Sequence, residues 1–230
     1  MRGRRPDQPN FAPVPEPDAR DVRHRVSGVL VFMSNKSEVI VLGEDHKSFA
    51  RSVDGLLAGR TVFSVEYHGL DPNPENAAGL ILAEFETRYP EIDTLDYGLI
   101  LRTDQGHFHI TWDSTFFSYG VIVTRLSDDH PKPSYGTTIE ASHRPQCSPL
   151  IGKVILGADI IWDRVMYTNS EESHVYPQWL RIRYSEGAVY LSASEILRDD
   201  LVATGFMDNI LVTSEREMAI RILQFPHTSA

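Results

Sequence analysis

Apolar and polar positions alternate along much of this chain, which is the two-residue period of β-strands. The clearest case is the stretch 99–110, which is interrupted at 103–106 by Thr-Asp-Gln-Gly. A short loop that ends in glycine is a common β-hairpin connection, because glycine accepts the backbone angles of a tight turn. The predicted cross-strand pairs, first on the apolar face and then on the polar one, are Leu101 with Phe108, Leu99 with Ile110, Arg102 with His107, and Ile100 with His109.

The same pattern recurs later in the chain. The sequence LILRTDQGHFHITWDS (99–114) aligns without a gap on LRIRYSEGAVYLSASE (180–195), with a second turn at Ser185-Glu186-Gly187. The predicted core face of this second hairpin consists of Leu180, Ile182, Val189 and Leu191.

Two further blocks repeat in the same order around these hairpins. LAGRTVFSVEY (57–67) resembles LIGKVILGADI (150–160), and Val-Ile-Val-Thr at 121–124 resembles Ile-Leu-Val-Thr at 210–213. An ordered set of three matches indicates an internal duplication. The predicted repeat units are 57–124 and 150–213.

A few segments show other patterns. Apolar residues at helical spacing predict a helix over 47–57, with Asp45 as its N-cap and Gly59 at its end. The remaining predictions are a short buried strand at 38–42, a helix over 76–89, and a helix over 218–223 opened by a capping box at 214–217.

We therefore expect an α+β fold, mainly antiparallel β-sheet built from two duplicated β units, with a few short helices. Residues 26–230 are expected to form a single pseudo-symmetric domain, because each unit has too few strands to close its own core. Residues 1–25 contain five of the 14 prolines and predict a disordered tail. The Pro- and Ser-rich segment 127–149 reads as the connector between the units.

The charge of the chain narrows its possible partners. The formal net charge is −10, and a body this acidic repels a phosphate backbone and an anionic lipid surface. The expected partner is a protein with a basic surface. The single cysteine, Cys147, is expected to be an unreactive surface or half-buried residue, and it excludes an internal disulfide. No segment has the roughly 20 apolar residues that span a bilayer, so a cytoplasmic location is expected.

The stretch GHFHITWD (106–113) carries the most specific candidate for chemistry. His107 and His109 lie two residues apart, so both imidazoles project from one face of a strand. Paired histidines bind metal ions in many β-barrel enzymes, where further ligands complete the site. Asp113, on the same face, and His68, from the preceding strand, are the candidate additional ligands.

The second repeat unit favours a different interpretation of this face. The positions of His107, His109 and Asp113 correspond there to Ala188, Tyr190 and Ser194. A face that accepts such varied side chains is expected to meet solvent or a partner, and metal binding stays as the alternative.

Aromatic residues gather beside acidic ones in two places, which is typical of protein-binding surfaces. The candidate partner-binding residues are Trp112, Phe116, Phe117, Tyr119, Tyr176 and Trp179.

Part of the chain resembles small uncharacterised bacterial proteins, some of which accompany secreted toxins as immunity proteins. The shared features lie mainly within 150–213: Leu-Ile-Gly-Lys at 150–153, Pro-Gln-Trp-Leu at 177–180, and Gly187 before an alternating strand. The resemblance implies no functional residues.

The leading hypothesis is a non-enzymatic protein-binding protein without a cofactor, in the form of an immunity-type inhibitor of a bacterial toxin. The alternatives are a metal-dependent β-fold enzyme that uses His107 and His109, and a module that binds a small ligand between its two halves.

Overall fold

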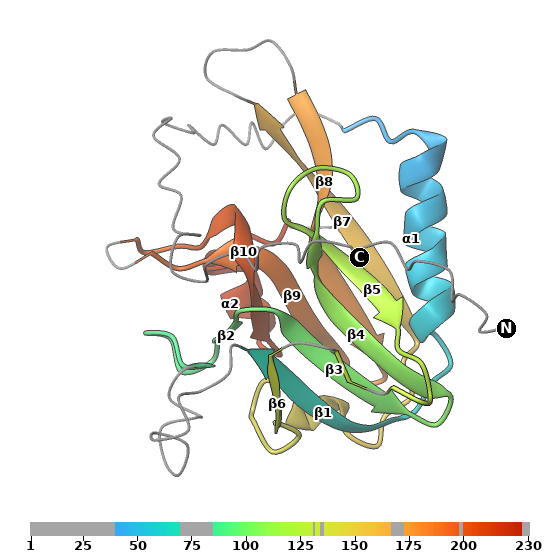
Figure 1. Cartoon of the computed structure of the whole chain (residues 1–230). Helices are drawn as coiled ribbons and strands as arrows, with labels where there is room; N and C mark the ends of the chain where they lie inside the picture. Colours follow the sequence, from blue (N-terminus) through green and yellow to red (C-terminus); the bar gives the residue numbers. More distant parts are fainter. Residues whose placement is uncertain are drawn as a thin grey trace, which may run out of the picture.

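The computed structural model describes residues 40–69, 85–130, 132–133, 136–166, 173–197 and 200–226. Within these residues the chain is mostly antiparallel β-sheet, with few helices and two five-stranded sheets that face each other (Figure 1). The predicted tail at 1–25, residues 38–39 of the predicted strand and residues 76–84 of the predicted helix lie outside the described residues.

The first sheet has the strand order β5-β4-β3-β1-β6, so β1, β3, β4 and β5 form an up-and-down meander. Its hairpin has the predicted register, with Leu99 opposite Ile110 and Leu101 opposite Phe108. The strands are β1 (Val62–Gly69), β3 (Gly98–Thr103), β4 (Gly106–Asp113), β5 (Gly120–Arg125) and β6 (Thr137–Glu140).

The second sheet has the order β2-β10-β9-β8-β7, and β7 to β10 form a meander of the same kind. Its hairpin pairs Leu180 with Leu191 and Ile182 with Val189, and these predicted core residues are all buried. The strands are β2 (Asp93–Leu95), β7 (Gly157–Met166), β8 (Ser173–Tyr184), β9 (Gly187–Glu195) and β10 (Thr204–Thr213).

The two meanders have equivalent registers wherever the repeated sequences align. In the first, Tyr67 faces Leu99, and in the second the aligned Ile160 faces Leu180. The last pair of strands agrees as well, because Ile110 faces Val123 as Leu191 faces Val212. Equal register means that the aligned apolar side chains occupy the same face in both sheets.

The sheets are joined by two short extended segments that pair with each other just before β1 and β7. Thr61 lies opposite Val154 in an antiparallel bridge. The hydrogen bonds around it are reciprocal: Gly59 N–H donates to Ile155 O and Gly152 N–H donates to Val62 O, both at 2.8 Å. Val62 N–H donates to Lys153 O at 3.0 Å, and Ile155 N–H donates to Arg60 O at 2.9 Å. The junction therefore has a local two-fold symmetry.

One hydrophobic cluster fills the space between the sheets. It takes its side chains from the inward positions of both hairpins, including Leu101, Phe108, Ile182 and Val189. Sheets that are apolar on one face are stable only when that face is covered, and here each sheet covers the other.

Helix α1 (Glu44–Leu57) confirms the predicted first helix and lies along one side of the sandwich beside β5 and β7 (Figure 1). The prediction of Asp45 as N-cap is wrong, because Gly43 occupies the cap and Asp45 belongs to the first turn. The predicted strand is also wrong at residues 40–42, which form no regular element. Val41 is 84% exposed there, so its apolar character is not used for burial.

Three other predictions need correction. Helix α2 (Arg216–Arg221) forms near the predicted place, but its N-cap is Glu215 and no capping box is made. Residues 85–89 are not α-helical, and Glu86 instead forms a β-bridge with Asp93. The segment 127–149 is more than a connector, because it contributes β6, which pairs with β1.

None of the helices within the described residues has the length and apolar character needed to cross a membrane.

Gly98 is expected to be essential for the first hairpin. Its φ is +138°, and a Cβ there would lie 1.9 Å from the carbonyl oxygen of Ile110. The Gly98→Ala variant should lose at least about 3 kcal/mol of unfolding free energy in urea titrations. Gly55→Ala is the matched control. No atom lies within 4 Å of its added Cβ, so this helical site should gain up to about 1 kcal/mol. Equal effects of the two substitutions would contradict this account.

Candidate functional site

The structure brings two histidines together on the outer face of the first sheet. Nδ1 of His68, on β1, lies 3.0 Å from Nε2 of His109, on β4, which is a hydrogen-bond distance. His68 is fully buried and His109 is 5% exposed. The face of His107 and His109 was expected to meet solvent or a partner, but the His109 side chain is buried within the chain.

Small residues make the contact between the histidines possible. β3 lies between β1 and β4, and the residue opposite His68 on that strand is Gly98, which has no side chain to separate the rings. Gly136 covers the pair from the other side, since a Cβ there would lie 2.7 Å from Nε2 of His68. Tyr97 packs beside His68 with its ring centroid 4.9 Å away.

This environment keeps His109 neutral. Burial lowers the pKa of His109 to about 4, and the neighbouring His68 adds to the effect. One ring nitrogen donates and the other accepts in this contact, so it satisfies one buried nitrogen of each imidazole. The contact links β1 to β4 on the outer face of the sheet.

His107 belongs to a separate group on the same face. Its Nδ1 lies 3.5 Å from Nη1 of Arg102, whose Nε donates to Glu66 at 2.6 Å. Burial alone would raise the pKa of Glu66, but the hydrogen bond and charge of Arg102, with Lys132 nearby, bring it below its ordinary value. Glu66 therefore balances a half-buried guanidinium.

The predicted metal ligands His107, His109 and Asp113 do not converge on one site. Asp113 accepts hydrogen bonds from the backbone and hydroxyl of Thr115, at 2.8 and 2.7 Å, and so shapes its own turn. Across the described residues, no group of three or more His, Cys, Asp or Glu side chains could hold a metal ion.

The candidate partner-binding aromatics are mostly used for packing. Tyr176 is 1% exposed and Trp179 is 6% exposed, so neither ring is on the surface of the isolated chain. Phe117 is stacked between His174 and Phe206, with centroid distances of 4.1 and 5.0 Å. The other three also contact aromatic rings: Trp112 packs on Tyr119, and Phe116 packs on Trp162.

Cys147 lies in a buried network of hydrogen bonds that connects β2 to β1. Arg144 binds Asp93 through two hydrogen bonds, one of them from Nε at 2.9 Å, and Tyr67 donates to the same carboxylate at 2.7 Å. The thiol of Cys147 donates to Tyr67 at 3.3 Å. Burial raises the pKa of Cys147 to about 12, which favours the thiol over the thiolate. The prediction of a surface or half-buried cysteine is wrong, because the Cys147 side chain is buried.

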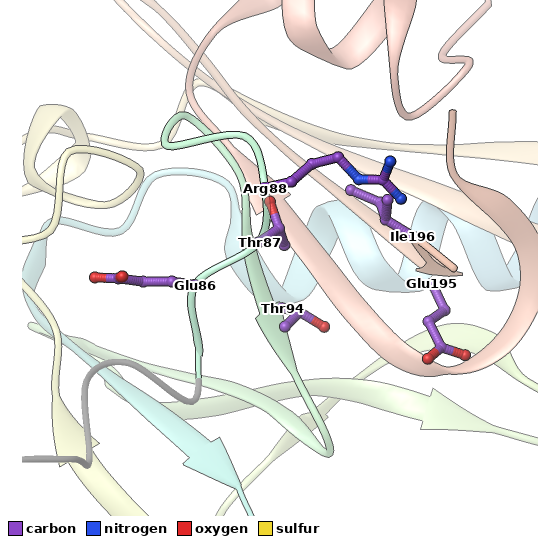
Figure 2. A pocket seen from close by; sticks show the side chains of 6 residues that line it. All are labelled: Glu86, Thr87, Arg88, Thr94, Glu195 and Ile196. Carbon is purple, nitrogen blue, oxygen red and sulfur yellow. The ribbon is translucent and has the colours of Figure 1, made fainter. Parts of the chain in front are cut away.

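A surface pocket of about 330 Å³ lies near β2 and the end of β9 (Figure 2). Glu86 and Glu195 stand on opposite sides of it, and Thr94 lies between them in this view. Burial raises the pKa of Glu195, and the charge of Asp208 raises it further. The carboxylate of Glu195 therefore lies in the electrostatic field of Asp208. Its lining residues are Glu86, Thr87, Arg88, Thr94, Glu195 and Ile196.

The sequence patterns identified neither this pocket nor a set of exposed apolar side chains at the junction of the sheets. Phe63, Leu156 and Val154 are 60%, 58% and 46% exposed. One signal was present: Phe63 and Leu156 are aligned in the repeated blocks, next to the inward-facing Val62 and Ile155. The acidic pocket has no local signal, because its residues come from separate parts of the chain.

The histidine pair should make the fold sensitive to acid. The folded pKa of His109 is about 4 and the ordinary value is 6.5, so the unfolded chain binds the extra proton first as pH falls. The stabilisation is complete above pH 6.5 and is lost as pH falls towards 4, by about 3 kcal/mol. His109→Gln should flatten this part of the stability curve in urea titrations between those pH values.

His107→Gln is the matched control, because it removes an imidazole from the same strand and leaves the buried pair intact. It should retain the acid sensitivity. A curve for His109→Gln as steep as that of the wild type would show that another group is responsible.

The Asp93 network should be important for stability. Asp93→Asn leaves the guanidinium of Arg144, which is 11% exposed, without its charged partner, so we expect a loss of about 3 kcal/mol in thermal or urea unfolding. Glu86→Gln is the control, because Glu86 is 62% exposed and its contact with Arg144 is a longer one, at 3.6 Å. Its cost should stay below about 1 kcal/mol. A smaller effect of Asp93→Asn than of Glu86→Gln would exclude this role.

Comparison with known proteins finds no match for this chain: no family model, no curated protein and no solved structure is similar to it.

Proposed function

We propose that this protein is a cytoplasmic, non-enzymatic binding protein whose partner is a protein with a basic surface. An immunity-type inhibitor that covers the basic surface of a toxin is the specific form of this proposal. The observation that carries it is the acidic pocket between β2 and the end of β9 (Figure 2).

The pocket suits a lysine or arginine side chain. Glu86 and Glu195 both contribute to its lining, with Thr94 between them, although the Glu86 carboxylate extends away from the other two in Figure 2. The raised pKa of Glu195 means that its charge is opposed by burial and by Asp208. A cation that enters the pocket relieves this opposition and forms charge-assisted hydrogen bonds.

The lining also limits which cations fit. Arg88 lies in the wall, and its guanidinium donates to the carbonyl oxygen of Leu197. Glu86 is within 3.6 Å of Arg144, so part of its charge is balanced inside the protein. The pocket is acidic enough to attract one basic side chain and holds too little net charge for a dense cluster of them. The net charge of −10 attracts basic proteins at long range and so adds to the selectivity of this chain for a basic partner.

We also propose that the two meanders are duplicated units, as the repeated sequence blocks suggest. Their equivalent registers and the reciprocal bonds of the junction support this proposal. The proposed binding site then draws on both units, with Glu86 and Thr94 from the first and Glu195 from the second. Glu195 ends β9, whereas the aligned position in the first unit is Ser114.

Affinity capture with the immobilised full chain in an extract of the native host, followed by calorimetry with the purified partner, tests the function. We expect a basic protein in a 1:1 complex. The double variant Glu86→Gln/Glu195→Gln should weaken binding about tenfold, because it removes both pocket carboxylates. Added salt should weaken the wild-type complex.

The control is Asp128→Asn/Asp129→Asn, which changes the net charge equally in an exposed loop away from the pocket. It should change the affinity less than about threefold. A stoichiometric partner that is not basic, the absence of any such partner, or equal effects of the two double variants would each refute the proposed function.

A further inference from the structure

The connection between β9 and β10 presents apolar side chains to solvent beside the acidic pocket. Leu201 is 76% exposed, and Leu197 and Val202 are each 40% exposed. Single exposed apolar residues are common on protein surfaces, but neighbouring ones mark interaction sites. We call these three side chains the apolar rim.

Hydrogen bonds hold the apolar rim next to the pocket. Arg88 and Glu195 both line the pocket (Figure 2). The guanidinium of Arg88 donates to the carbonyl oxygen of Leu197, which follows Glu195 by two residues. The next residue in the chain, Tyr89, donates from its hydroxyl to the carbonyl oxygen of Leu201 at 2.7 Å. The rim and the pocket therefore share one wall.

The described part of the connection gives the rim a fixed backbone. Asp200 N–H donates to the carbonyl oxygen of Leu197 at 3.1 Å, and the carboxylate of Asp200 accepts from the hydroxyl of Thr204 at 3.2 Å. Ala203 is buried, and its N–H donates to the carbonyl oxygen of Ile222 at 2.8 Å. A surface that is already ordered loses less conformational freedom when a partner covers it.

We propose that the apolar rim and the pocket form one binding surface for a protein segment in which a lysine or arginine is flanked by apolar side chains. The inference rests on the proposed function, because it uses the pocket as the site of the basic side chain. The flanking apolar side chains cover Leu201 and its neighbours, and the hydrophobic effect then adds to the charge interaction in the pocket.

The chemistry of this surface decides between the possible occupants. A purely apolar segment would bury the carboxylate of Glu195 without a cation, which is unfavourable. A purely basic segment would leave Leu201 in water. An acidic segment would be repelled by Glu195 and by Asp208, whose charge already raises the pKa of Glu195. A basic residue between apolar ones satisfies the pocket and the rim together.

Four blocked pentapeptides test the inference in NMR titrations of the full chain at millimolar peptide concentrations. Their central residue is lysine or glutamine, and its two neighbours are both leucine or both serine. The peptide with lysine between leucines should bind most tightly. Replacing the lysine or both leucines should weaken binding at least about threefold in each case.

Two variants connect these preferences to the surface. Leu201→Ser should weaken the peptide with lysine between leucines at least about threefold and leave the peptide with lysine between serines within about 1.5-fold of wild type. Glu195→Gln should weaken both lysine peptides. Leu156→Ser is the matched control, because Leu156 is 58% exposed at the junction of the sheets, and it should change neither affinity.

The outcomes separate this inference from the proposed function. If Glu195→Gln weakens both lysine peptides and Leu201→Ser weakens neither, the pocket takes a basic side chain but the rim takes no part, and the inference is overturned alone. Failure of the lysine peptide with leucines to bind, or equal effects of Leu201→Ser and Leu156→Ser, would also overturn it. The proposed function is judged separately, by the 1:1 complex with a basic protein.

Discussion

The fold depends on the reciprocal pairing of two short segments, 59–62 and 152–155, around Thr61 and Val154. Each meander is apolar on one face and cannot bury that face alone. The junction positions the first strand of each sheet relative to the other, so that the two apolar faces meet and form one core. The same pairing leaves alternate side chains of the junction pointing outward, among them Phe63, Val154 and Leu156.

The outer faces of the two sheets differ because different segments cover them. On the second sheet, Tyr190 and Ala188 pack with Trp179, Ala219 of helix α2 and Phe225 in an apolar cluster. On the first sheet, the positions aligned with Tyr190 and Ala188 are His109 and His107, and their partners are polar. Buried polar groups require hydrogen-bond partners. On the first sheet His68 is the partner of His109, and the Arg102–Glu66 pair lies beside His107.

The acidic pocket draws its lining from distant parts of the chain, because Glu86 and Thr94 lie at or near β2 and Glu195 lies at the end of β9. Its lining includes two carboxylates, and burial together with the charge of Asp208 raises the pKa of Glu195. Such a lining favours a basic side chain.

The alternation of apolar residues by itself determined both hairpins, including the pairing of Leu101 with Phe108 and of Ile182 with Val189, because register follows from a two-residue period. A different spacing, that of apolar residues along a helix, indicated the helix before β1. Only the tertiary structure decided that His109 meets His68 across a glycine, and that Glu86 and Glu195 share a pocket. These residues are distant in sequence, and periodicity reports which face a side chain occupies but not what covers that face.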